Sequence, residues 1–198
     1  MSQDGKYQES ELVCPICAQN IFKQSHSLLS SRTKTYLGLD WTNPTADMHI
    51  CFNCLHILWF LDKAIGMQGE SLVWQDEQPL ICPLCQEEKL ISRETLLSDK
   101  ATTMFNTDWG NPAALNYICT SCGFMQWFLN AADGEGGETV TVADHELHCT
   151  RCNHAHFERS TTLLSSRSAT LLHLDWTSPE ADTYTCTRCG NIEWFQQG

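Results

Sequence analysis

The sequence has few basic residues for its length. It holds 12 Lys and Arg against 24 Asp and Glu among 198 residues, so its formal net charge is -12. This surplus of negative charge opposes unaided attraction to nucleic acid and to anionic lipid. We therefore expect a protein partner in preference to RNA or DNA, and no membrane partner.

Long hydrophobic runs are also missing. No stretch approaches the roughly 18 consecutive apolar residues of a membrane span. The first ten residues, MSQDGKYQES, lack the apolar core of a signal peptide. These absences predict a soluble, cytoplasmic protein. Because cytoplasmic thiols stay reduced, the 12 cysteines indicate metal ligands in preference to disulfides.

The cysteines fall into three groups with one spacing. Each group reads C-x2-C, then 33 residues, then C-x2-C, and the groups begin 68 and then 67 positions apart. Between Leu12 and Phe60 the three copies align without a gap, and 15 of these 49 positions are identical in all three. The repetition predicts three modules with the boundaries 1–68, 69–137 and 138–198, joined by linkers such as LNAADGEGGETVTVADHE.

Two C-x2-C pairs are the ligand set of a closed tetrahedral zinc site, because each tight turn aims two thiolates at one ion. Gaps of 27 and 26 residues between neighbouring copies offer another pairing, but the constant 33 favours pairing within a copy. Pairing across copies would also leave the first and last pairs to close the whole chain. We predict three zinc ions, one per module, held by Cys14, Cys17, Cys51 and Cys54; Cys82, Cys85, Cys119 and Cys122; Cys149, Cys152, Cys186 and Cys189.

The predicted metal has a structural role. A module of roughly 50 residues buries too little surface to be stable alone, and bound zinc contributes on the order of 10 kcal/mol. Four thiolates leave no open coordination position, so we expect no enzyme activity. The alternative is a rubredoxin-like electron-transfer protein with iron in the same cages. An exchangeable zinc store is a third hypothesis.

Short strands and turns dominate the expected secondary structure. LHILWF, FMQWF and NIEWF predict strands, and DWTNP, DWGNP and DWTSP predict turns. SHSLLSSRTKTYL is ambiguous, and we favour a short strand over a helical turn there. We expect ESLVWQ and ETVTVAD to be short strands at the edge of the following module. The fold class is therefore all-β: three tandem zinc ribbons, each a short antiparallel sheet with two C-x2-C turns.

Several other residues recur in every copy. Asp40, Asp108 and Asp175 predict Asx-type turns. No His or Glu recurs at a matched position beside them, so the repeats contain no shared acid–base pair, and no His is assigned as a ligand. The tryptophans that follow these aspartates are expected to cap the small cores; they are Trp41, Trp109 and Trp176.

A Trp-Phe pair ends the last strand of each copy. Neighbouring strand residues point to opposite faces, so one ring of each pair faces away from its own core. That ring either packs against a linker or a sister module or forms an external docking surface. A cation after LLSS or LLSD is a further candidate for contacts with phosphate or RNA bases. The candidate partner-binding residues are Trp59, Phe60, Trp127, Phe128, Trp194, Phe195, Arg32, Lys100 and Arg167.

From its first cysteine pair to its WF dipeptide, each copy resembles the zinc-ribbon superfamily. LLSSRTKTYLGLDWTNPTADMHICFNCLHILWF is similar to small bacterial zinc-ribbon proteins often labelled as nucleic-acid-binding. The resemblance implies a ribbon fold with zinc held by four cysteines. The sequence departs from the usual ribbon pattern where glycine is absent after a cysteine pair, at Ala18, Gln86, Asn153 and Leu55, although Gly123 and Gly190 follow the other two pairs.

Overall fold

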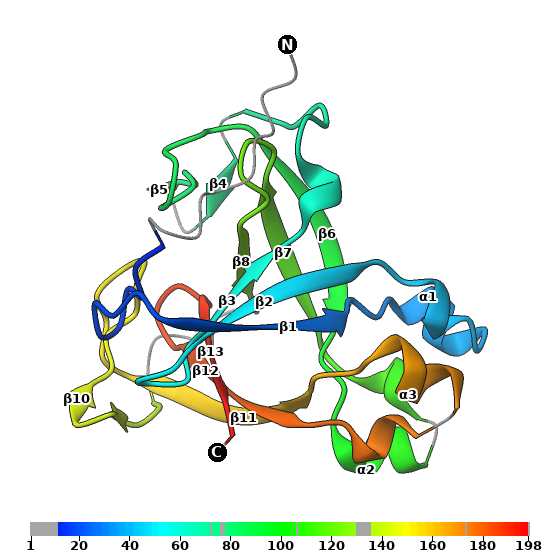
Figure 1. Ribbon diagram of the computed structural model, residues 1–198. Helices are drawn as coiled ribbons and strands as arrows, with labels where there is room; N and C mark the ends of the chain where they lie inside the picture. The colour runs from blue at the N-terminus through cyan, green and yellow to red at the C-terminus, as the bar shows by residue number, and fades with distance from the viewer. Residues whose placement is uncertain are drawn as a thin grey trace.

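Three sheets surround a common centre in the computed structural model, which describes residues 12–71, 73–75, 78–105, 107–129, 136–172 and 174–197. A short helix from each repeat lies at one end of the molecule (Figure 1). Strands dominate and the helices are short, so the prediction of small all-β modules is confirmed.

Each repeat folds in the same way, with a long middle strand paired antiparallel to two outer strands. In β2, Ala46, Met48 and Ile50 are buried and alternate with half-exposed residues, which is the period of a sheet with one covered face. The strands are β1 (Phe22–Leu28), β2 (Thr45–Cys51) and β3 (Ile57–Phe60); β6 (Leu90–Leu96), β7 (Ala113–Cys119) and β8 (Met125–Phe128); β11 (Phe157–Leu163), β12 (Glu180–Cys186) and β13 (Ile192–Gln196).

The connection between the first two strands is partly helical. In SHSLLSSRTKTYL we favoured a short strand over a helical turn, but the stretch contains both, since β1 ends at Leu28 and α1 begins at Arg32. A helix of five residues is too short to produce a recognisable period, which explains the error. The helices are α1 (Arg32–Tyr36), α2 (Lys100–Met104) and α3 (Arg167–Leu171).

The predicted DW turns are confirmed as single 3-10 turns. In each, the backbone N–H of the third residue after the aspartate donates to the aspartate carbonyl, as from Asn43 to Asp40 at 2.9 Å. The turns are η2 (Asp40–Thr42), η4 (Asp108–Gly110) and η5 (Asp175–Thr177), and a further turn, η3 (Asp62–Ala64), follows β3.

The three repeats close into a ring with approximate threefold symmetry. The residue after or at the end of each last strand donates its N–H to a cysteine turn of the next repeat: Leu61 to Gly123 at 2.8 Å, Leu129 to Gly190 at 2.9 Å and Gln196 to Leu55 at 2.9 Å. Each helix packs against the 3-10 turn of the next repeat, α1 on η4, α2 on η5 and α3 on η2. The repeats therefore form one body.

A shared hydrophobic core lies on the axis of this ring. Its centre is a triad of tryptophans, Trp59, Trp127 and Trp194, whose ring centroids are 4.8 to 5.1 Å apart. Around them lie equivalent residues of all three repeats, such as Ile57, Met125 and Ile192. The apolar face of each sheet is thus buried against the other two sheets.

As predicted, each linker pairs with the edge of the following repeat, but only through a single β-bridge. Glu70 exchanges two backbone hydrogen bonds with Leu90, and Glu138 does so with Phe157. The short strands nearby pair within their own hairpins, β4 (Trp74–Gln75) with β5 (Gln78–Pro79) and β9 (Thr141–Val142) with β10 (His145–Glu146). The module boundaries 1–68, 69–137 and 138–198 stay a prediction. Among the described residues, no helix is long and apolar enough to span a membrane.

Candidate metal centres

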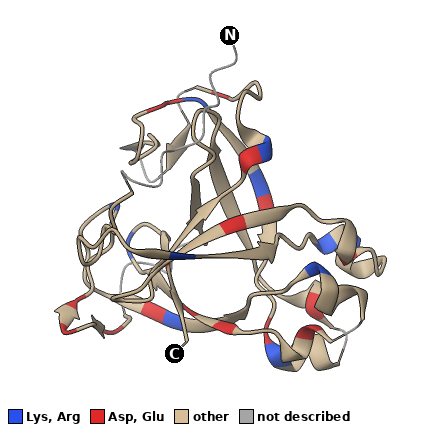
Figure 2. Ribbon diagram, viewed as in Figure 1, with Lys and Arg blue, Asp and Glu red and all other residues tan. Residues whose placement is uncertain are grey.

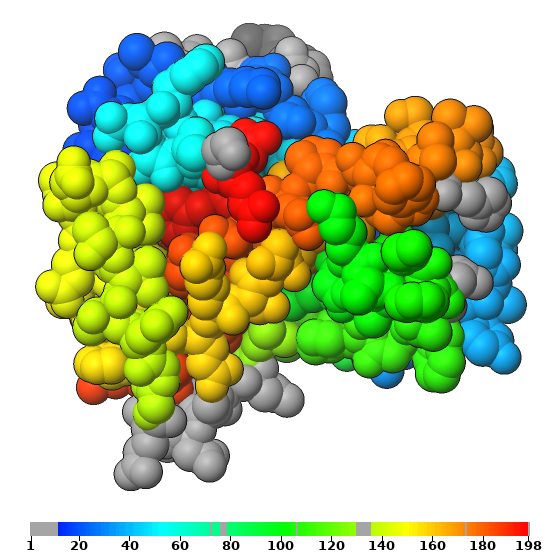
Figure 3. Space-filling model, turned by 90° about the horizontal axis from the view of Figure 1, so that it is seen from below, coloured from blue at the N-terminus to red at the C-terminus, as the bar shows by residue number. Residues whose placement is uncertain are grey.

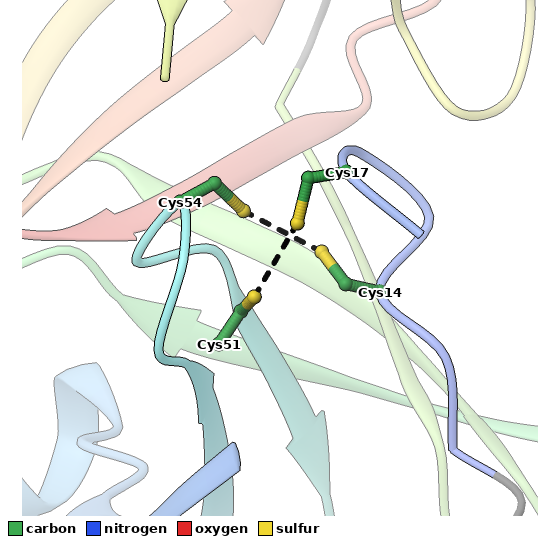
Figure 4. A group of neighbouring side chains, drawn as sticks. All are labelled: Cys14, Cys17, Cys51 and Cys54. Atoms are coloured by element: carbon green, nitrogen blue, oxygen red, sulfur yellow. Dashed lines mark hydrogen bonds between the residues drawn. The ribbon is translucent and has the colours of Figure 1, made fainter. Parts of the chain in front are cut away.

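Each repeat brings its four cysteines together. In every group the four sulfur atoms lie within 4.8 Å of one another. Figure 4 shows the first site, in which the turn carrying Cys14 and Cys17 faces the turn carrying Cys51 and Cys54. Pairing therefore occurs within a repeat, and the alternative pairing between neighbouring repeats is wrong.

The sulfur geometry fits a tetrahedral metal ion. Four sulfurs at about 2.3 Å from one ion would be about 3.8 Å apart. The observed separations include 3.5 Å between Cys14 and Cys54 and 3.6 Å between Cys82 and Cys122. All four donors are protein thiols, so an ion held by the whole set has no open position for a substrate.

The six cysteine turns share one backbone geometry. The N–H of the first cysteine donates to the carbonyl five residues later, as from Cys51 to His56 at 2.9 Å. The residue after the second cysteine has a positive φ, whether it is Leu55 at 62° or Gly123 at 76°. Ala18, Gln86 and Asn153 have φ values of 57° to 60°. The missing glycines thus leave the turns unchanged and place side chains in a left-handed conformation, which costs about 1 kcal/mol each.

The grouped thiols favour one thiolate in each site. A hydrogen bond from Cys54 lowers the pKa of Cys14 to about 3, and one from Cys122 lowers that of Cys119 to about 2. A hydrogen bond from Cys149 likewise lowers the pKa of Cys186. The same hydrogen bonds raise the pKa of the donor thiols Cys54, Cys122 and Cys149, with Cys186 as the partner of the last. A divalent cation in place of the thiol protons allows all four sulfurs to ionise.

The predicted docking role of the Trp-Phe pairs is wrong. Both rings of every pair are buried, with exposed fractions of 2 to 5%. The tryptophans form the axial triad, and the phenylalanines pack on the metal side of their own sheets, as Phe128 does against Tyr117 at 5.8 Å. Of the two possibilities for the outward ring, packing against a sister repeat is the one observed. The residues concerned are Trp59, Phe60, Trp127, Phe128, Trp194 and Phe195.

The three recurring cations bond to a neighbouring repeat. Arg32 donates to the carbonyl of Asn111 at 3.1 Å, and Arg167 to that of Asn43 at 3.4 Å. Lys100 forms an ion pair with Glu180 at 2.8 Å. Charged segments of both signs accordingly lie close together around the three helices (Figure 2). These contacts link neighbouring repeats. A role of the cations in partner binding stays a prediction.

A concave surface lies where the three helices meet, and it was not predicted from the sequence. Figure 3 shows segments carrying α1 (blue), α2 (green) and α3 (orange) gathered at one end of the molecule. The hollow has a volume of about 840 Å³ and is lined by the helices and DW turns of all three repeats. The last helical residues, Tyr36, Met104 and Leu171, are 73%, 69% and 61% exposed. We name this hollow the axial bowl.

Two of the three DW tryptophans line the axial bowl, and the third packs against the lining residue Tyr36. Trp41 and Trp176 are the lining pair, and Trp109 packs edge-on against Tyr36 with the ring centroids 6.4 Å apart. All three are 47 to 49% exposed. The prediction that they cap the module cores is therefore wrong. The sequence places a large residue shortly after each LLSS or LLSD segment, at Tyr36, Met104 and Leu171. Whether these three residues meet depends on how the repeats close into the ring.

The floor of the axial bowl is polar and acidic. Asp40, Asp108 and Asp175 lie in it, and the aspartates accept hydrogen bonds from threonine hydroxyls at 2.5 to 2.6 Å. Burial raises the pKa of Asp40 and of Asp108, and the charges of Asp175 and Asp108 raise that of Asp40 further. A cavity of about 30 Å³ adjoins this floor. It is lined by Ser30, Ser98, Ser165, Thr35, Thr103, Thr170 and the three aspartates.

The four-cysteine groups identify the repeats as zinc-ribbon-like metal-binding modules. In comparisons with known proteins, no family model, no curated protein and no solved structure matched the chain.

Proposed function

We propose that this chain is a non-enzymatic adaptor in which three zinc ions hold a rigid ring of repeats and the axial bowl docks a protein partner. The observation that carries the proposal is the gathering of exposed apolar side chains from three distant segments on one concave face. Soluble proteins seldom expose such patches without a binding role. The net charge of -12 favours a protein partner over RNA or DNA.

Affinity purification from cytoplasmic extract tests the docking proposal. The bowl variant carries Y36S, M104S and L171S, which remove exposed apolar groups from helices that contain no buried residue. We expect its recovery of partner proteins to fall at least about tenfold, the effect of losing a few well-buried apolar contacts.

A matched control carries I21S, F52S and M67S, three exposed apolar residues outside the axial bowl. It should recover the same proteins as the wild type. Equal recovery by wild type, bowl variant and control would contradict the proposal, as would recovery of nucleic acid alone.

We propose zinc as the metal, and membership of the zinc-ribbon superfamily, because closed four-thiolate cages in small β modules are typical of structural zinc. A rubredoxin-like protein holding iron in the same cages is the alternative. Elemental analysis of protein purified from iron-replete cells should find about three zinc ions per chain and a colourless sample. Bound iron with red absorbance would support electron transfer instead.

A further inference from the structure

The axial bowl combines features that together specify the chemistry of its occupant. Its rim is apolar and aromatic, its floor carries three carboxylates, and a small oxygen-lined cavity of about 30 Å³ adjoins that floor. We propose that the axial bowl binds the primary ammonium group of a lysine side chain presented by the protein partner. This inference rests on the proposed docking role of the same surface.

Symmetry favours an ammonium group over a guanidinium group. The carboxylates of Asp40, Asp108 and Asp175 come from equivalent positions of a threefold ring. An ammonium group has three hydrogens around a threefold axis, and each can be directed at one carboxylate. A guanidinium group is planar and forks toward a single carboxylate, so it matches this floor less well.

Size and lining fit the same group. About 30 Å³ is roughly the volume of one water molecule in the liquid, which is close to the size of an ammonium head. The apolar stem of lysine can lie along the rim, which includes Tyr36 and Trp41. The apolar rim and the acidic floor therefore suit an apolar stem with a compact positive end.

The lining of the small cavity is identical in the three repeats. Of the aligned positions from Leu12 to Phe60, 15 of 49 are identical in all three copies. Every residue that lines the small cavity comes from one of three such positions, the Ser30, Thr35 and Asp40 sets. The ionised forms of the aspartates are disfavoured in this place, because burial raises the pKa of Asp40 and Asp108 and the charges of Asp175 and Asp108 raise that of Asp40 further. A cation that pairs with them gives their retention a physical reason.

Titration with short peptides tests the inference directly. The probes are Ac-Gly-Gly-Xaa-Gly-Gly-amide peptides in which Xaa is lysine, arginine, Nε-acetyl-lysine or norleucine. Binding is followed by the NMR signals of the indole N–H groups of Trp41 and Trp176. We expect saturable shifts with lysine, and affinity at least about tenfold weaker with acetyl-lysine and norleucine, because a charged hydrogen-bonding group has been lost.

The protein variants locate the site. D40N/D108N/D175N should weaken lysine binding at least about tenfold. The matched control E88Q/E94Q/E158Q makes the same charge change at exposed glutamates outside the axial bowl, and should alter affinity less than about twofold. Retained metal content and NMR dispersion verify folding. The peptide series on wild-type protein decides the question even where the triple variant does not fold.

Each unfavourable result has a distinct meaning. Equal binding of arginine and lysine, equal binding of acetyl-lysine, or equal loss in the glutamate control would overturn the ammonium site. If partner recovery depends on Tyr36, Met104 and Leu171 but not on the aspartates, the docking proposal stands and this inference falls. If the lysine peptide binds as expected while no protein is recovered through the axial bowl, the docking proposal falls alone.

Discussion

At the scale of single residues, the tryptophan triad has the largest effect on stability. Trp127 is 3% exposed, and its ring lies 5.0 Å from Trp59 and 4.8 Å from Trp194. One indole ring therefore contacts both other repeats. A residue on the axis therefore stabilises the contacts between repeats, whereas a residue buried inside one repeat stabilises that repeat alone.

We predict that Trp127→Ala lowers the free energy of unfolding by about 3 to 5 kcal/mol, because it leaves a cavity shared by all three repeats. Denaturant unfolding of metal-loaded protein measures this. Trp109→Ala is the control: its ring is 49% exposed, so the loss should be much smaller. Equal losses in the two variants would contradict the buried triad.

The floor aspartates give a second prediction. Burial raises the pKa of Asp40, so its ionised form opposes folding. This penalty is present at neutral pH and disappears as the pH falls toward the ordinary carboxyl value of about 3.9. Asp40→Asn should therefore leave the free energy of unfolding unchanged or raise it, and the gain should shrink with acidification.

Denaturant unfolding at about pH 7 and about pH 5 tests this sign. Asp40→Ala supplies the contrast, since it deprives the Thr35 hydroxyl and the Asn43 amide of their acceptor. We expect that variant to lose about 1 kcal/mol. A clear loss of stability in Asp40→Asn would show that the charge itself supports the fold.

At the scale of elements, the cysteine turns follow one rule despite different sequences. Leu55 adopts the left-handed conformation that Gly123 and Gly190 adopt in the other repeats. The backbone bond from the Leu55 N–H to the Cys51 carbonyl is 3.0 Å long, and that from Gly123 to Cys119 is 2.9 Å. The turn therefore keeps one backbone geometry, and the side chain of Leu55 is tolerated at a cost.

Leu55→Gly should raise the free energy of unfolding by up to about 1 kcal/mol by relieving this strain. The reverse change, Gly123→Ala, should lower it by more than about 1 kcal/mol, since a Cβ there would also lie 3.0 Å from the carbonyl oxygen of Leu61. Thermal unfolding of the metal-loaded variants measures both. Opposite signs would mean that the turns do not need this conformation.

At the scale of the whole molecule, metal binding and the ring depend on each other. The repeats share one core, so none of them can keep its covered face buried alone. We predict that chelation unfolds all three repeats in one cooperative transition, and that Cys82→Ser, which breaks one site, destabilises the other two. Each site contributes on the order of 10 kcal/mol.

The measurement compares metal release, followed with a coloured chelator, with tryptophan fluorescence from the triad. Coincident curves are expected for wild-type protein. Three separate steps, or normal metal content in the first and third sites of Cys82→Ser at elevated temperature, would show that the repeats fold independently.

The ligands and the repeat unit were predictable because their signals are local or rest on a fixed spacing. All twelve cysteines group within their own repeats, as the constant gap of 33 residues indicated. The short helices were missed, since five residues carry too little pattern. The sequence indicated that one ring of each Trp-Phe pair must be buried outside its own core. The pattern of one strand does not show which surface buries that ring.

The sequence alone determined the four-cysteine groups, the main strands and the turns, because each depends on residues within one repeat. Only the tertiary structure decided that the three sheets enclose a tryptophan triad and that Tyr36, Met104 and Leu171 meet around three aspartates. The physical reason is that these contacts join surfaces about 67 residues apart in the chain. Whether such surfaces meet depends on their shapes fitting together, and shape is a property of the folded repeats.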